Sequence, residues 1–128
     1  MISKEDYKQR LTEIIRLDGR YEREAYNFVL MSINFSITVI VRRNTITAKE
    51  LLDGMRIYSL EKFGPMSRMV MEHWGVFSCK DFGEIVLNLI NKGIVEGAIE
   101  HVVEEFEEVG FDFTEAFEEP YRDFSKDN

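Results

Sequence analysis

The sequence predicts a predominantly helical α+β domain, with five or six helices around one hydrophobic core and a minor β element at Phe35–Arg43. Hydrophobic residues make up 45% and aromatic residues 12% of the 128 positions, which is ample material for one core. Three amphipathic helical segments follow one another between Thr47 and Asn91, separated by glycine stop signals. The Phe35–Arg43 run (FSITVIVRR) is instead rich in β-branched residues, which favour a strand. We therefore expect a single domain, 1–128, ordered over about 1–120 and frayed over 121–128.

Two helices are expected ahead of the β element. Ser3 can cap the first helix, with Asp6 in its first turn, and Gly19 can end it in a left-handed conformation. The second helix has one apolar face, formed by Tyr21, Ala25, Phe28, Val29 and Ile33. The pattern leaves open whether this helix stops near Phe35 or continues as one helix to Arg43.

Further local signals organise the rest of the chain. Thr47 and Glu50 form a T-x-x-E capping box at the start of the third helix. Pro65 can open the fourth helix and Ser78 can cap the fifth, and a sixth helix is expected over about Glu96–Glu108. The expected centre of the core consists of Leu51, Met55, Phe63, Met69, Val70, Trp74, Phe82, Ile85, Val86 and Leu89.

Acidic charge is concentrated near the C-terminus. The formal net charge is −8, and twelve of the 24 acidic residues lie in 96–128, where Arg122 and Lys126 are the only bases. An acidic surface repels phosphate backbones, so nucleic acid is a disfavoured partner.

The single cysteine, Cys79, suggests a reducing compartment, and the charged N-terminus has no apolar signal core. No apolar run approaches the ~20 residues of a membrane span, so we expect a cytoplasmic protein that does not enter a membrane.

Residue types that catalyse reactions or hold metals form no recognised constellation. His101 could share a helix face with Glu104 and Glu105, but this His-x-x-Glu order occurs once, and a solvated acidic face is the better explanation. Cys79, near a helix start, and His73 lack a third group that would orient them. No catalytic residue, cofactor or metal site is therefore predicted, and an enzyme is the least favoured class.

A basic cluster is the one candidate binding patch. Arg42 and Arg43 precede the capped third helix, and Lys49 and Arg56 lie on it. Such a cluster can hold a phosphate or a carboxylate at the helix N-terminus. Pairing with the protein's own acidic residues is the simpler interpretation, since surface ion pairs are common and seldom functional.

Several motifs carry a family resemblance. The strings FGPMSRMVMEHWGV (Phe63–Val76) and DFGEIVLNLI (Asp81–Ile90) resemble a family of short uncharacterised bacterial cytosolic proteins. The YEREAYNFV (Tyr21–Val29), ITAKELLDG (Ile46–Gly54) and FDFTEAF (Phe111–Phe117) segments support the same resemblance. It implies a bacterial cytosolic protein and no particular activity, because the family has none assigned.

Two classes of function remain. The favoured class is a non-catalytic interaction protein that binds an unknown protein partner or itself, as a homodimer through Phe28–Val41, a stretch too apolar for a monomer surface if its far face is exposed. The alternative is a nucleic-acid-binding or regulatory module with a winged-helix-like centre, in which helices three to five are followed by a wing beginning at Gly93–Gly97. The fifth helix carries Asp81 and Glu84 beside Lys80, a poor set of side chains for reading DNA.

Overall fold

The computed structural model describes residues 2–97 and 100–126, and this part of the chain is predominantly helical, as the sequence predicts. The helices in chain order are α1 (Lys4–Leu17), α2 (Arg23–Phe35), η1 (Ser36–Val41), α3 (Ala48–Phe63), η2 (Gly64–Met66), α4 (Ser67–His73), α5 (Cys79–Asn91), α6 (Val102–Glu108), η3 (Thr114–Glu118) and α7 (Glu119–Lys126). Elements η1 and η3 are π-helical, and η2 is a 3-10 turn. Helix α7 occupies most of the segment that we expected to be frayed.

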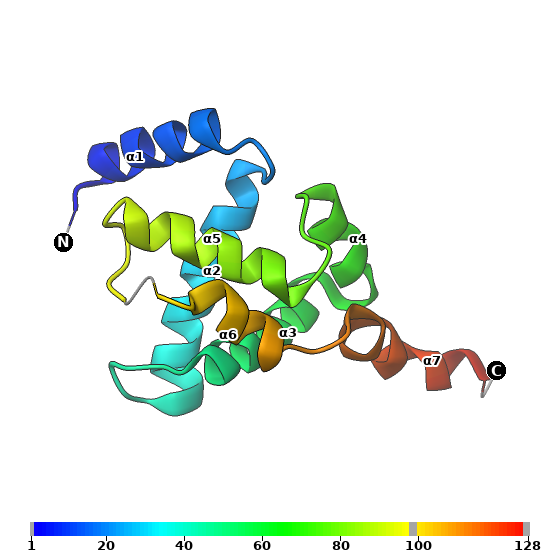
Figure 1. Cartoon of the computed structure of the whole chain (residues 1–128). Coiled ribbons are helices and arrows are strands. Elements are labelled where there is room, and N and C mark those ends of the chain that lie inside the picture. Colours follow the sequence, from blue (N-terminus) through cyan, green and yellow to red (C-terminus); the bar gives the residue numbers. More distant parts are fainter. Residues whose placement is uncertain (1, 98–99, 127–128) are drawn as a thin grey trace.

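The helices form one bundle with α5 and α2 at its centre. Figure 1 shows α5 crossing α2, with α6 beside α5 and α1 along one edge of the molecule. The most extensive contacts join α5 to α6 and α2 to α3. Helix α7 extends away from the bundle on the side opposite α1. Because α5 and α3 cover only part of α2, its residues Glu24, Asn27 and Met31 remain exposed.

The predicted β element at Phe35–Arg43 is wrong, because no strand occurs in residues 2–97 or 100–126. Helix α2 continues directly into η1, and the helical segment ends at Arg42, whose φ of 55° is left-handed. The inner side of this segment is buried against α3. Ser36 is fully buried, and a Cβ on Gly54 of α3 would lie 1.7 Å from the Ser36 Oγ, so the two elements approach as closely as a glycine permits. Such burial outweighs the strand propensity of the β-branched residues.

The winged-helix outline lacks its wing in the described residues. The segment Gly93–Gly97 contains a turn, with Gly93 at a φ of 67°, and no strand. The sixth helix is also shorter than predicted, since α6 begins at Val102 and not at Glu96. Val102 follows His101, whose φ of 63° is left-handed and marks the helix start.

Most of the predicted core is buried, but its aromatic centre is Phe28. Six predicted residues are buried, namely Leu51, Met55, Phe82, Ile85, Val86 and Leu89. Phe63, Val70 and Trp74 are half-buried. The buried ring of Phe28 lies 5.6 Å from Trp74 and 6.3 Å from Phe82, measured between ring centroids. It also contacts Tyr58 and Phe63, at 5.7 and 6.2 Å.

The prediction for Met69 is wrong. Its side chain is 62% exposed, whereas Met71 is fully buried. The 3-10 turn η2 is the cause, because it sets the rotation of α4. The single proton of the Ser67 hydroxyl is shared between the carbonyl oxygens of Ser59 at 3.0 Å and Gly64 at 2.8 Å, which holds Ser67 inward. Met71 lies one helical turn after Ser67 and therefore shares its buried face.

Two predicted helix starts are confirmed. The Ser3 Oγ accepts a hydrogen bond from the Asp6 N–H at 3.1 Å at the start of α1. The Thr47 and Glu50 side chains bond reciprocally to each other's backbone N–H, at 3.1 and 3.0 Å, which completes the capping box of α3. Polar side chains thus satisfy the first N–H groups of both helices.

Two other helix termini differ from prediction. Ser78 precedes α5 but its side chain makes no capping hydrogen bond. The Asp81 carboxylate instead reaches back and accepts from the Phe77 N–H at 2.8 Å. Helix α1 ends at Asp18 in an extended conformation, so the left-handed ending expected at Gly19 is absent.

Candidate functional site

The outer side of α2 and η1 is exposed and uncharged. Between Glu24 and Arg42 the sequence contains no charged residue. We define the α2 strip as the exposed residues Asn27, Met31, Asn34, Thr38 and Val39. The spacing of three or four between the first four places them on one helix face. Met31 and Val39 are each 53% exposed, so large apolar side chains face solvent in a chain whose residues are 31% charged.

The segment Arg23–Val41 is, by length and composition alone, the one part of the described chain that could cross a membrane. Its most apolar window has a mean hydropathy of 1.4 and is 33% buried. The core helix of a soluble protein meets the same criterion. Here the inner residues of α2 are packed in the bundle, namely Ala25, Tyr26, Phe28, Val29 and Ser32. One side of the segment is therefore packed in the bundle, and its opposite side is uncovered.

Two hollows flank Met31 in the groove between α2 and α3. The first, of about 360 Å³, is lined by Leu30, Met31, Asn34, Phe35, Thr38, Val39 and Tyr58. The second, of about 170 Å³, is lined by Glu24, Asn27, Phe28, Met31, Tyr58, Lys62, Phe63 and Trp74. The Tyr58 Oη lies 3.7 Å from the Met31 Sδ, and the Tyr58 ring lies 5.3 Å from that of Phe35. The surface thus combines a ridge, Met31, with hollows that can receive apolar side chains.

Opposite charges mark the two ends of the α2 strip. Glu22, Arg23 and Glu24 lie at its N-terminal end, and Arg42 and Arg43 follow its C-terminal end. Arg23 is half-buried and donates to the Thr12 hydroxyl of α1 at 3.0 Å, so the exposed charges at the N-terminal end are the two glutamates. Arg43 forms an ion pair with Glu50. In the described part of the chain, Glu24 and Arg42 take part in no ion pair.

The structure places the predicted basic cluster around the start of α3. Arg43 and Lys49 each form an ion pair with an acidic residue of α3. Arg42 is exposed and Arg56 is half-buried. None of the four lines a hollow described here. The role of this cluster as an anion-binding patch stays a prediction. Two of its four side chains, Arg43 and Lys49, already form ion pairs within the protein.

The largest of the three hollows described here, of about 730 Å³, lies between the α2–η1 junction, the start of α3, and helices α5 and α6 with their connection. Its lining combines apolar side chains with Glu96, Glu100 and Glu105. Gly97 and Glu100 flank residues 98 and 99, so this hollow borders a part of the chain outside the described residues. Acidic residues beside an apolar hollow do not define a ligand by themselves, and we assign no site here.

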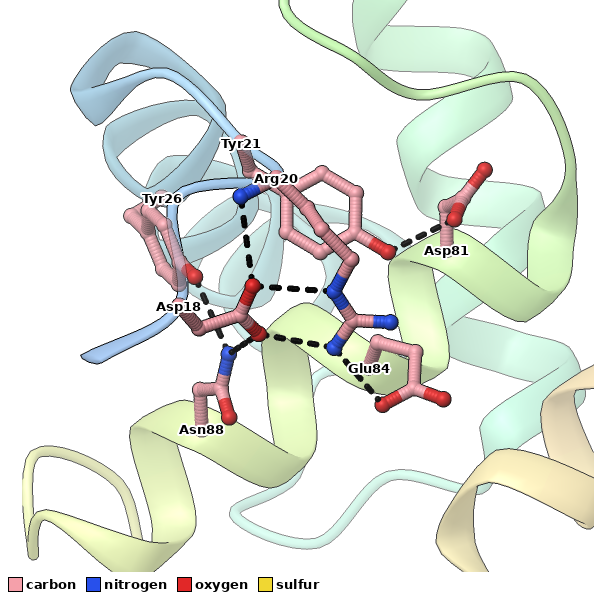
Figure 2. A network of polar contacts seen from close by, with 7 residues as sticks. All are labelled: Asp18, Arg20, Tyr21, Tyr26, Asp81, Glu84 and Asn88. Atoms are coloured by element: carbon pink, nitrogen blue, oxygen red, sulfur yellow. Dashed lines mark hydrogen bonds and ion pairs between the residues drawn. The ribbon is translucent and has the colours of Figure 1, made fainter. Parts of the chain in front are cut away.

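A polar network fastens the α1–α2 turn to α5, as Figure 2 shows. Arg20 donates to the Asp18 carboxylate twice, from Nε at 2.9 Å and from Nη2 at 2.7 Å, and its Nη2 also reaches Glu84 at 3.2 Å. The Asn88 Nδ2 donates to Asp18 and to the Tyr26 hydroxyl, both at 3.0 Å. Hydrogen bonding, chiefly from Arg20, holds the pKa of the Asp18 carboxyl well below its usual range.

A second branch of this network joins Tyr21 to Asp81. The Tyr21 hydroxyl donates to Asp81 at 2.6 Å. Two causes raise the Tyr21 pKa, of which burial is the larger and this hydrogen bond the smaller. No member of the network lines a hollow described here, and its bonds join the α1–α2 turn to α5. The network is not predictable from local sequence patterns, because the residues that it joins across the fold are 60 to 70 positions apart. The available signal was the spacing of Asp81, Glu84 and Asn88 on one face of α5.

Cys79, His73 and His101 do not combine into a reactive or metal-binding group. The buried Cys79 Sγ accepts from the Phe111 N–H at 3.4 Å and donates to its carbonyl at 3.5 Å, and burial raises the pKa of the thiol to about 11. His73 is exposed, and His101 precedes α6 and so shares no helix face with its glutamates. Among the described residues, no three His, Cys, Asp or Glu side chains are placed to hold a metal ion.

No protein-family model matches this chain, and no curated protein or solved structure is significantly similar to it. The resemblance carried by Phe63–Val76 and Asp81–Ile90 therefore stays a prediction.

Proposed function

We propose that this chain is a non-catalytic interaction protein that self-associates as a homodimer through the α2 strip. The observation that carries this proposal is the exposure of Met31 and Val39 on an uncharged helix face between Glu24 and Arg42. When a partner removes exposed apolar groups from water, the free energy falls by roughly 25 cal/mol per Å² of buried apolar surface.

The shape of the surface supports a second copy as the partner. A twofold interface uses the same patch on both subunits, so the patch must be complementary to itself. The α2 strip carries both the Met31 ridge and the hollow of about 360 Å³ beside it. Met31 of each subunit can therefore enter the hollow of the other, as knobs enter holes between packed helices.

The charge distribution supports the same partner. Two copies with a net charge of −8 repel each other over most of their surfaces. The α2 strip is a place where two copies can meet without bringing carboxylates together. A buried unpaired charge at such an interface is costly, so an uncharged face suits it.

The test is the oligomeric state of the Met31→Glu variant. The unmodified chain should form dimers in sedimentation equilibrium between about 1 µM and 1 mM, the range of weak to moderate association. Met31→Glu should weaken dimerisation at least about tenfold, because it places an unpaired carboxylate in the interface. Met69→Glu is the matched control, since Met69 is also exposed but lies on α4, and it should leave dimerisation unchanged.

Circular dichroism should show the same helix content for all three proteins, which separates loss of the interface from loss of the fold. A chain that stays monomeric to about 1 mM would remove the proposal. Equal weakening by Met69→Glu would show that the contact lies elsewhere. Binding of the monomer to phospholipid vesicles through Met31, without dimerisation, would assign the strip to a membrane surface and would also overturn the proposal.

The nucleic-acid alternative has no observation in its favour. A winged-helix reader needs a wing, and the described residues contain no strand. Its expected reading helix, α5, directs Asp81 and Glu84 into the polar network with the α1–α2 turn.

A further inference from the structure

Building on the proposed self-association, we infer that the two α2 strips pack antiparallel about a twofold axis at Asn34, so that Glu24 of each subunit faces Arg42 of the other. Self-association alone does not specify the orientation and register of the contact. The charges at the two ends of the α2 strip select the orientation, and the side chain at its middle selects the register.

The end charges select the antiparallel orientation. Glu24 and Arg42 lie at opposite ends of one helical segment, and neither forms an ion pair in the described part of the chain. Parallel packing would place Glu24 beside the partner's Glu24 and Arg42 beside the partner's Arg42. Antiparallel packing replaces both repulsions with two ion pairs related by the twofold axis.

Asn34 fits the position on the axis. It is the member of the α2 strip nearest the middle of the segment Glu24–Arg42. A residue on a twofold axis meets its own copy, so its side chain must be self-complementary. The amide of asparagine has both a donor and an acceptor, and two such groups can bond reciprocally. The Asn34 side chain is exposed and lines the hollow of about 360 Å³.

The same register brings the ridge to the hollow. Met31 lies three positions before Asn34, so an antiparallel partner places its Met31 a similar distance beyond the axis. That position is beside Phe35 and Thr38, which line the hollow. The end charges and the shape of the surface therefore favour the same register.

A charge exchange tests the orientation. Glu24→Arg alone and Arg42→Glu alone should each weaken dimerisation by about fivefold to thirtyfold at low salt, because each turns two attractions into repulsions. The double variant, which exchanges the charges, should restore the affinity of the unmodified chain. In a parallel dimer each of these residues would face its own copy, so a single variant would replace repulsion between two like charges with repulsion between two charges of the other sign, and the affinity would stay nearly unchanged. Unchanged single variants, or a double variant as weak as the singles, would overturn the antiparallel orientation.

Cysteine crosslinking tests the register. Asn34→Cys places two thiols at the axis and should give an oxidised, disulfide-linked dimer. Thr38→Cys is the control, because its two copies would be about 12 Å apart along antiparallel helices, beyond disulfide reach. The native Cys79 is buried and 4% exposed, so it should not compete.

Each outcome of the crosslinking experiment has a defined meaning. Crosslinking at both positions would indicate parallel strips, and crosslinking at Thr38→Cys alone would indicate a shifted axis. A dimer that crosslinks at neither position would place the contact outside the strip. All three results overturn the inference. Absence of a dimer before oxidation would instead remove the proposed function, so the two failures are distinguishable.

Discussion

Two methionines of α4, Met69 and Met71, give a direct test of the core. Met71 is 0% exposed and Met69 is 62% exposed, although both are methionines on the same short helix. Replacing a buried methionine with alanine removes buried apolar surface and leaves a cavity, which costs about 2–5 kcal/mol. Replacing an exposed methionine usually changes stability by less than about 0.5 kcal/mol. We therefore expect Met71→Ala to lower the free energy of unfolding by about 2–5 kcal/mol and Met69→Ala to leave it nearly unchanged.

Urea unfolding followed by tryptophan fluorescence is a suitable assay. Trp74 is the only tryptophan, and its half-buried ring packs 5.6 Å from Phe28 and 5.7 Å from Phe63, so unfolding should change its emission. All proteins should be compared at one low concentration, because dimerisation would add to the apparent stability. A shifted midpoint with an unchanged slope reports stability alone. Equal losses in both variants, or a larger loss in Met69→Ala, would refute the described rotation of α4.

Three further predictions follow from packing and charge, and urea unfolding measures all of them, followed by circular dichroism for the comparison with Trp74→Ala because that variant lacks the only tryptophan. Gly54→Ala should lower stability by about 1–3 kcal/mol, because its Cβ would overlap Ser36, and Ser36→Gly in the same chain should recover most of that loss. Phe28→Ala should cost about 3–5 kcal/mol and more than Trp74→Ala, since Phe28 is buried and Trp74 only half-buried. The lowered pKa of Asp18 stabilises the fold above its ordinary pKa of 3.8, and this stabilisation is lost as pH falls through the folded-state value. The stability of the unmodified chain should therefore fall more steeply below about pH 4 than that of Asp18→Asn, and parallel pH profiles would contradict the role of this carboxylate.

Local signals in the sequence predicted most of the helical architecture. The caps at Ser3 and Thr47 act within one turn of the chain, so their chemistry is visible in neighbouring residues. The core positions on α5 were also predictable, because the apolar residues Phe82, Ile85 and Leu89 recur at helical spacing.

The incorrect predictions arose where distant contacts decide the local structure. The β-branched run Phe35–Arg43 favours a strand in isolation, but the close approach of Ser36 to Gly54 requires helix packing that sequence periodicity does not show. The exposed position of Met69 depends on η2 and the Ser67 hydroxyl bonds, which rotate α4 relative to a continuous helical pattern.

The candidate surface was partly visible in the sequence. The stretch Phe28–Val41 is apolar and uncharged, which predicted an interface. Its hollows depend on Tyr58 of α3, and no spacing rule connects Tyr58 to Met31. The basic cluster at Arg42 and Arg43 was visible too, but the ion pair between Arg43 and Glu50 became evident only in three dimensions.

The π-helical geometry of η1 has a consequence for how the chain tolerates changes in length. A π turn closes a hydrogen bond over five residues, whereas an α turn closes it over four. Loss of one residue between Ser36 and Val41 could thus be absorbed by tightening η1 into ordinary helix, with the Ser36–Gly54 contact retained. Because a π turn holds one extra residue while the turns on either side stay in phase, such a deletion would leave Arg42 at about the same angle around the helix axis, with the bundle intact.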